Sequence, residues 1–229
     1  MLIVETDGQV RHLRLNRPEK RNALSFELCR QLTAALDIAD QDPSIHAILL
    51  TAEGPAFCAG MDLKEIGLVN EADLSLIHDS LFTAGSRLSK PLIAAVAGPA
   101  IAGGTGLAAN AHIVVAGPDA TFGLPEIKIG LWPLLVFRAV AQAVGERRAT
   151  ELSLTGRRFT AAEANWMGLV TEVHEAAELR AKELAATVAG FRREAVSLGL
   201  EYVRESRTRT WEESGQRARV LRAQLLGSS

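Results

Sequence analysis

Two glycine-bearing segments constrain this chain more than any other feature. Residues 56–64 read Ala-Phe-Cys-Ala-Gly-Met-Asp-Leu-Lys, and residues 98–106 read Gly-Pro-Ala-Ile-Ala-Gly-Gly-Thr-Gly. Each follows an apolar run that predicts a buried strand, and each leaves backbone N–H groups unhindered by bulky side chains. Two such donors, converging from separate loops, could hold a developing oxyanion. The pattern favours an enzyme that stabilises an enolate.

Length and charge limit what kind of molecule can carry such a site. The chain has 229 residues, of which 48% are hydrophobic and 23% charged, and a formal net charge of −2. This suits one domain, or one domain with a short appendage, around a sizeable core. The near-neutral charge provides no global field for nucleic acid or a membrane surface, so we expect neither as a partner. The uncharged stretch 92–109 is broken by glycines and a proline, which argues against a membrane span.

Cysteine and histidine spacing gives no sign of a metal site or a disulfide framework. Cys29 and Cys58 lie far apart without CxxC spacing, and the five histidines show no HExxH or paired pattern. The N-terminal residues have neither the basic nor the apolar region of a secretory signal. We therefore expect a reduced, cytoplasmic protein without a bound metal.

Local patterns predict an α/β region up to residue 173 and a helical region after it. Expected strands cover residues 2–5, 10–15, 45–51, 92–97 and 113–116, the first two joined by a hairpin turn at Asp7-Gly8. Two expected helices start at the N-caps Ser25 and Thr160. The other expected helices cover residues 71–88, 105–111, 134–144, 146–154, 175–190, 194–206 and 211–226. We divide the chain into an α/β core with the site (1–173) and a helical region (174–229) that covers the core, a ligand or a neighbouring subunit.

Six segments, in order, resemble those of the crotonase superfamily, the enoyl-CoA hydratases and isomerases. They are residues 16–24, 47–51, 56–64, 90–104, 120–130 and 154–173. The resemblance implies an α/β, crotonase-like spiral of ββα units with a C-terminal helical layer, assembled as a homotrimer or hexamer. It also implies an acyl-CoA thioester substrate, with coenzyme A as part of that substrate and no separate cofactor.

The resemblance also places the family's catalytic groups. The two oxyanion donors fall on the backbone N–H groups of Met61 and Gly103, and the acid/base position falls on Glu126. The residues themselves agree, because Gly103 is expected at a helix N-terminus, where free N–H groups and the helix dipole favour negative charge. A carboxylate half-buried among Phe122, Leu124 and Ile127 should be a stronger base than an exposed one.

Coenzyme A contacts are carried over from the resemblance alone. In the family they begin at the positions of Lys20, Arg21, Asn22 and Ala23, and Ala59, Asp62 and Leu63 lie beside the path of the adenine and the pantetheine. Without the resemblance, a lysine and an arginine at a turn would be expected to be ordinary surface charges.

One departure from the family pattern bears on the reaction. Hydratases of this family carry a second glutamate three residues after Gly103, where this chain has Gly106. A single base can still remove a proton from one carbon of a thioester dienolate and return it to another. We therefore favour Δ3,Δ2-enoyl-CoA isomerisation. Two alternatives stay open: a hydratase that relies on Glu126 alone or with another nearby side chain, and a catalytically silent acyl-CoA-binding protein.

A second departure follows directly after Glu126. Residues 131–137, Leu-Trp-Pro-Leu-Leu-Val-Phe, replace the glycine-rich run that is more common in the family. This predicts a narrower or differently shaped acyl pocket. Trp132 and Phe137 could line it, although large aromatic side chains more often belong to the core.

Overall fold

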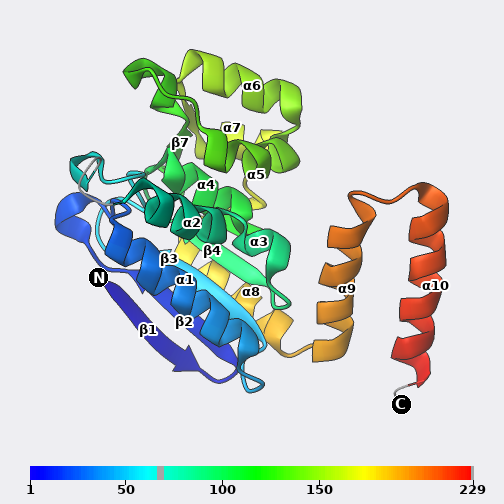
Figure 1. Cartoon of the computed structure of the whole chain (residues 1–229). Coiled ribbons are helices and arrows are strands. Elements are labelled where there is room, and N and C mark those ends of the chain that lie inside the picture. Colours follow the sequence, from blue (N-terminus) through cyan, green and yellow to red (C-terminus); the bar gives the residue numbers. More distant parts are fainter. Residues whose placement is uncertain (66–69, 228–229) are drawn as a thin grey trace.

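Six strands form the central sheet of this computed structural model, which describes residues 1–65 and 70–227 (Figure 1). In spatial order they are β1 (Leu2–Asp7), β2 (Val10–Leu15), β3 (Ala47–Ala52), β4 (Leu92–Val96), β6 (Ile113–Ala116) and β9 (Glu172–Val173). The predicted hairpin pairs β1 with β2 in antiparallel register, and every later pairing in this sheet is parallel. Parallel strands are buried on both faces, which explains why β3, apart from Thr51, and β4 are apolar.

A second, smaller sheet carries the segments expected to hold the site. Its strands are β5 (Ala100–Ile101), β7 (Thr121–Gly123) and β8 (Arg158–Thr160), in that order. The rings of Phe122 and Phe159 stack across β7 and β8 with centroids 5.7 Å apart. β5 leads into α4 (Gly103–Asn110), and β7 leads into the 3-10 helix η3 (Pro125–Ile129). The small sheet therefore links Gly103 to Glu126.

One face of the large sheet is covered by α1 (Phe26–Gln41), α2 (Glu71–Phe82), α3 (Ala84–Arg87) and α4 (Figure 1). As predicted, Ser25 caps α1: its hydroxyl accepts a hydrogen bond from the Leu28 N–H at 3.2 Å. The single helix predicted over 71–88 is instead two helices. They meet at Thr83, whose hydroxyl donates to the Asp79 carbonyl at 2.6 Å. Such bonds from a side chain to the carbonyl four residues earlier often bend helices.

Three further helices lie above the small sheet: α5 (Leu134–Val144), α6 (Glu146–Thr155) and α7 (Ala161–Met167). The predicted N-cap of α7 is confirmed, because the Thr160 hydroxyl accepts from the Glu163 N–H at 3.2 Å. Two short 3-10 helices, η1 (Pro18–Lys20) and η2 (Leu63–Glu65), lie in the loops beside the predicted site.

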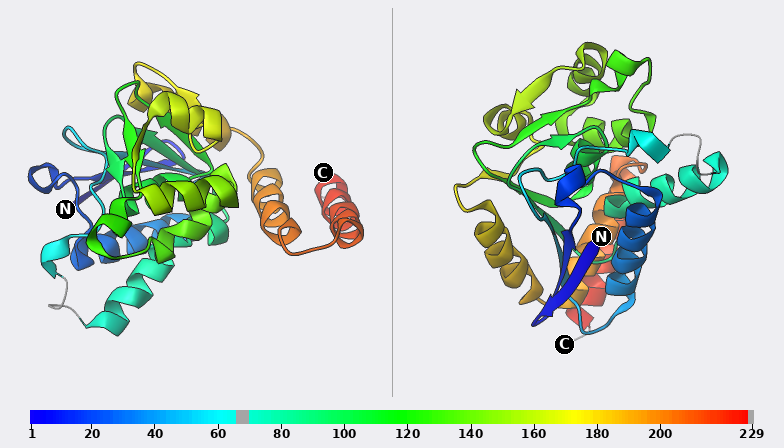
Figure 2. Two further views of the ribbon diagram at one scale, coloured as in Figure 1. Left: turned by 90° about the horizontal axis from the view of Figure 1, so that it is seen from above. Right: turned by 90° about the vertical axis from the view of Figure 1, so that its left-hand side faces the viewer.

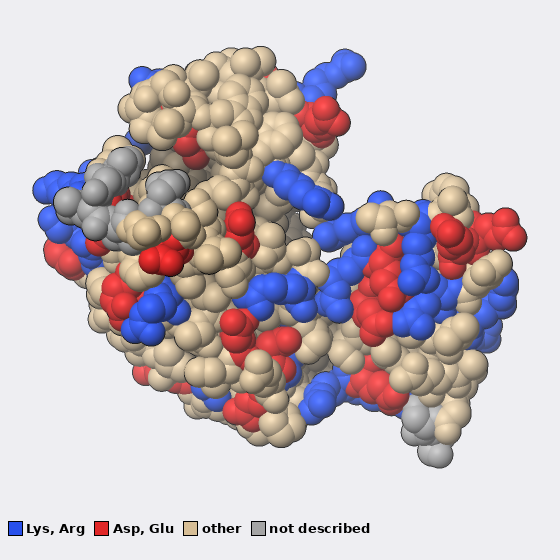
Figure 3. Space-filling model, viewed as in Figure 1, with Lys and Arg blue, Asp and Glu red and all other residues tan. Residues whose placement is uncertain are grey.

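The helical region after residue 173 has two parts. α8 (Ala177–Ala189) lies on the face of the large sheet opposite α1 (Figure 2). Its alanines at every fourth position, 177, 181, 185 and 189, are buried against β3, β4 and β6, so α8 is a core helix. α9 (Arg193–Ser206) and α10 (Trp211–Gly227) pack against each other and extend away from the sheets, with many charged side chains on their surface (Figure 3).

The alanine face of α8 leads to a stability prediction. Ala185→Leu inserts a large side chain where α8 contacts the sheet, so we expect a loss of about 1–3 kcal/mol in the free energy of unfolding. Ala186→Leu, at the next and exposed position, is the matched control and should change it by less than about 0.5 kcal/mol. Chemical denaturation measures both. Equal effects of the two variants would contradict the placement of α8.

Candidate active site

The two glycine-bearing segments lie against each other, backbone to backbone. The Cys58 N–H donates to the Pro99 carbonyl at 3.1 Å, and the Ile101 N–H donates to the Cys58 carbonyl at 2.9 Å. A Cβ on Gly104 would lie 3.0 Å from the Cys58 carbonyl carbon and closer still to its oxygen. Only glycine permits this approach, so the predicted convergence of the two loops is built into the sequence.

Met61 lies in the first of these loops, and its N–H points away from the neighbouring segment at Leu24. Leu24 bridges this loop in parallel: its N–H donates to Gly60 at 2.7 Å, and its carbonyl accepts from Asp62 at 3.0 Å. In a parallel bridge the central residue's own N–H and C=O face the other side. No acceptor in the described part of the chain pairs with the Met61 N–H.

Gly103 begins α4, so its N–H has no acceptor within the helix. The N-cap, Ala102, has a φ of +54° and provides no side-chain cap. A Cβ on Gly60 would lie 3.3 Å from the Gly103 nitrogen, which shows how close the two loops are. The structure therefore brings both predicted donors, Met61 and Gly103, to adjoining backbone positions.

Glu126 is tied to the same region through the start of α4. The Ala102 N–H donates to the Gly123 carbonyl at 2.8 Å. The Thr105 hydroxyl lies 2.7 Å from the Ala100 carbonyl and accepts from the Gly123 N–H at 3.1 Å. These bonds join α4 to β7. The helix η3, which contains Glu126, follows β7 in the chain. Sequence reasoning missed Thr105, since a buried threonine in a glycine-rich run has no distinctive pattern.

The Glu126 carboxylate is partly buried and incompletely paired. Its Oε2 atom is shielded from solvent and has no hydrogen-bond partner among the described residues. Burial raises the pKa of this carboxyl, as expected from the sequence. Phe122 and Leu124 are fully buried nearby, whereas Ile127 is 38% exposed, so the expected apolar surroundings are open on that side. A buried, unpaired carboxylate oxygen is costly and is typical of functional sites.

The place of a second carboxylate is filled by an apolar side chain. A Cβ on Gly106 would lie 2.7 Å from the Cβ of Val136 and closer still to its Cγ1. It would also lie 3.3 Å from Cδ1 of Phe82. Val136, in α5, is 4% exposed and Phe82 is 7% exposed. A side chain at position 106 would therefore require α5 to move. Sequence reasoning noted Gly106 and residues 131–137 separately but missed their contact.

The segments expected to bind coenzyme A lie side by side. The Ala59 N–H donates to the Arg21 carbonyl at 3.0 Å, which aligns residues 20–23 with residues 59–63. Lys20, Arg21 and Leu63 are exposed, and Figure 3 shows basic side chains at this edge of the molecule. Ala23 and Ala59 are partly buried between them.

Two of the expected coenzyme A residues use their side chains to hold the loops. Asn22 is fully buried, and its amide donates to the carbonyls of Glu53 and Ala56 at 2.9 and 2.8 Å. The Asp62 carboxylate accepts a hydrogen bond from Arg17 at 2.8 Å, which lowers the pKa of Asp62. Their contact with coenzyme A stays a prediction. Arg17, which sequence reasoning did not single out, positions this loop.

The aromatic pair after Glu126 lies at the junction of the loop and α5. The rings of Trp132 and Phe137 are tilted with centroids 6.2 Å apart. Both are partly buried, and Phe137 packs against the main hydrophobic core. This contact agrees with a core role for Phe137.

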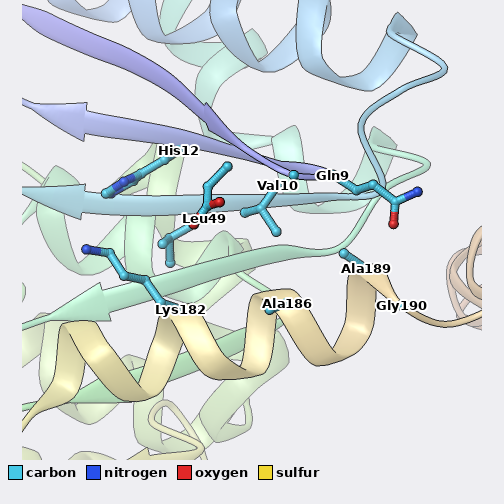
Figure 4. A pocket seen from close by; sticks show the side chains of 10 residues that line it. Gln9, Val10, His12, Leu49, Lys182, Ala186, Ala189 and Gly190 are labelled. Carbon is cyan, nitrogen blue, oxygen red and sulfur yellow. The ribbon is translucent and has the colours of Figure 1, made fainter.

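A cavity of about 270 Å³ lies away from these residues, between the β1–β2 hairpin, β3 and α8 (Figure 4). Its lining includes His12, Lys182 and Ala186 but none of the predicted site residues. Within residues 1–65 and 70–227, no group of three or more His, Cys, Asp or Glu side chains is arranged to hold a metal ion. The helices of this described part are too short or too polar to cross a bilayer.

The unpaired Glu126 carboxylate predicts a pH-dependent stability difference. Because the pKa of Glu126 is raised above its ordinary value of 4.5, the protonated carboxyl contributes its full stabilisation below pH 4.5. This stabilisation is lost as the pH rises through the raised pKa. Glu126→Gln removes the buried charge and should be more stable than the wild type at pH 7, with a smaller advantage near pH 4. Denaturant melts at both pH values measure this, with exposed Glu212→Gln as control. An advantage that is independent of pH would contradict it.

The contact between α4 and α5 predicts strong coupling between two substitutions. Gly106→Ala should destabilise the protein by about 1–3 kcal/mol, because the new methyl group overlaps Val136. In Gly106→Ala/Val136→Ala the overlap with Cγ1 is removed and the close contact with the Cβ at position 136 stays, so the combined loss should be smaller than the sum of the single losses by about 0.5–3 kcal/mol. Unfolding free energies of the four proteins test this, and additive losses would show that the two positions do not touch.

The comparisons with known proteins agree with this architecture. The family model for enoyl-CoA hydratase/isomerase matches residues 5–229. Enoyl-CoA hydratase EchA19 of Mycobacterium tuberculosis is 41% identical over 214 residues, which cover 89% of this chain and 80% of that protein. Mevalonyl-coenzyme A hydratase sidH of Aspergillus fumigatus is 38% identical over 173 residues, covering 74% and 64%.

Solved structures of enoyl-CoA hydratases have a similar fold. The crystal structure of enoyl-CoA hydratase from Mycobacterium smegmatis matches with a TM-score of 0.92 and 31% identity, covering 97% of this chain and 89% of that one. Enoyl-CoA hydratase from Bacillus anthracis matches with a TM-score of 0.91 and 29% identity, covering 99% and 91%. The chain therefore belongs to the enoyl-CoA hydratase/isomerase family, has the crotonase fold, and is an enoyl-CoA hydratase or isomerase.

Proposed function

We propose that this enzyme is a Δ3,Δ2-enoyl-CoA isomerase that uses Glu126 as its single base. Glu126 takes the proton from C2 of a 3-enoyl-CoA as the C2–H bond breaks. The electron pair passes into a dienolate, whose thioester oxygen accepts hydrogen bonds from the Met61 and Gly103 N–H groups. Glu126 then returns the proton to C4, which leaves the double bond between C2 and C3. No atom is gained or lost.

The observation that carries this proposal is the contrast between positions 126 and 106. Glu126 has a buried oxygen without a partner among the described residues, whereas Val136 fills the space beside Gly106. Water addition needs groups that orient a water and transfer its proton. Apolar Val136 and Phe82 face position 106 and offer no such group. A base that takes and returns one proton needs only Glu126.

Hydration is the second candidate, and the names of relatives favour it. The relatives from M. tuberculosis and A. fumigatus are both called hydratases. In this chain Glu126 would have to activate the water alone or with another nearby side chain. An acyl-CoA-binding protein without turnover is the third candidate. The buried, unpaired oxygen of Glu126 argues against it, because a binding protein gains nothing from that cost.

For the substrate, we propose that Lys20 and Arg21 bind phosphates of coenzyme A, and that Ala23, Ala59 and Leu63 line its path. Both basic side chains are exposed and form no ion pair with described residues. They are thus open to a phosphate-bearing ligand.

Assembly as a homotrimer or hexamer, and a cytoplasmic location, also stay predictions.

Product analysis tests the reaction. We expect 3-enoyl-CoA to convert to 2-enoyl-CoA at unchanged mass, and Glu126→Gln to lower kcat by roughly 100- to 10,000-fold, the usual range for loss of a general base. Glu212→Gln, the same change on the surface of α10, should leave kcat unchanged. Separation by chromatography and mass spectrometry identifies the products. The same assay is run with 2-enoyl-CoA, the substrate of a hydratase. A product heavier by one water would establish the hydratase, and binding of both compounds without turnover of either would establish the silent protein.

A further inference from the structure

Phe82 lies along the face of α4 that carries Gly103 and Gly106. These two glycines are three residues apart, so they share one face of the helix. A Cβ on Gly103 would lie 3.1 Å from Cζ of Phe82, and a Cβ on Gly106 would lie 3.3 Å from its Cδ1. One end of the ring is therefore beside Gly103 and the other side is beside Gly106.

Two more apolar side chains complete this surface. Val136 fills the space beside Gly106, and Cδ1 of Leu24 would lie 3.0 Å from a Cβ on Gly103. Leu24, Phe82 and Val136 all belong to the main core and are buried. They come from three separate parts of the chain: the loop before α1, the end of α2 and the first turn of α5. We name Phe82 and Val136 the acyl wall.

The acyl wall is part of the packed core. Leu81, beside Phe82, is 1% exposed, and α2 packs against α1, α4 and α5. Moving Phe82 or Val136 would therefore disturb core contacts, which are close-packed and resist displacement. An acyl chain that needs this space has to push against the core.

This inference rests on the proposed binding of the thioester oxygen by the Gly103 N–H. That bond places the first acyl carbons beside Gly103, close to Phe82. We propose that Phe82 and Val136 end the acyl site and restrict the enzyme to short-chain enoyl-CoA substrates. Each further methylene then has to displace part of the wall, and a pocket that is one methylene too small typically discriminates by tenfold or more.

A chain-length series tests this with two readouts. The first is kcat/KM for 3-enoyl-CoA substrates of four, six and ten carbons. The second is the affinity for saturated acyl-CoA of the same lengths, measured by calorimetry, which needs no turnover. The proteins are the wild type, Phe82→Leu, Phe82→Ala and Val136→Ala. Phe82→Leu is included because Phe82→Ala removes a buried ring and could prevent folding. Leu76→Ala, at a 69% exposed position on the same helix, is the matched control.

We expect the wild type and Leu76→Ala to prefer four carbons to ten by roughly tenfold or more in both readouts. Phe82→Leu or Val136→Ala should reduce that preference severalfold, chiefly by improving the ten-carbon compounds. Equal wild-type kcat/KM values and affinities for four and ten carbons would overturn the proposal. They would indicate that the acyl chain leaves the site across the exposed Leu131, Leu134 and Leu135. If nothing turns over, the isomerase proposal fails, and the affinities alone then decide about the wall.

Discussion

The direct backbone contact between the loops 55–62 and 98–104 is the constraint on which the site depends. A Cβ on Gly98 would lie 3.0 Å from the Pro55 carbonyl carbon, and one on Gly60 would lie 2.7 Å from Cβ of Ala102. Gly60 also has a φ of +90°, which side chains disfavour. A methyl group at these positions would separate the loops. The N–H groups of Met61 and Gly103 would then no longer adjoin, and small misplacements of such donors are costly in catalysis.

The same contact joins the two sheets. The loop at 98–99 leaves β4 of the large sheet, and β5 follows at once in the small sheet, paired with β7. Thr105 binds both strands from the first turn of α4. The predicted oxyanion donors and the proposed base are therefore attached to one hydrogen-bonded unit, although Met61 and Glu126 lie far apart in sequence. A site held by a sheet and a helix start is more rigid than one held by loops alone.

Elements with strong local signals were predictable from the sequence, and those that depend on tertiary contacts were not. The caps at Ser25 and Thr160, the β1–β2 hairpin and most helix bounds agree with the structure within two residues. The strands of the small sheet are two or three residues long, too short for a hydrophobic period, and depend on contacts such as the Phe122–Phe159 stack. The division at Thr83 coincides with side-chain hydrogen bonds from Thr83 to the preceding turn, which the helical period does not reveal.

The candidate site likewise has features that could be predicted from the sequence and features that could not. Glycine spacing alone indicated two converging donor loops, whereas the roles of Met61, Gly103 and Glu126 needed the family resemblance. The contact of Gly106 with Val136 joins two helices distant in sequence, and no local pattern reveals it. This contact also sets the electrostatics: without a second carboxylate nearby, burial alone raises the pKa of Glu126. An apolar wall lowers the local dielectric, which strengthens backbone hydrogen bonds to an enolate oxygen. In the mechanism we propose, an apolar side chain in place of a second carboxylate favours proton transfer within the substrate over the addition of water.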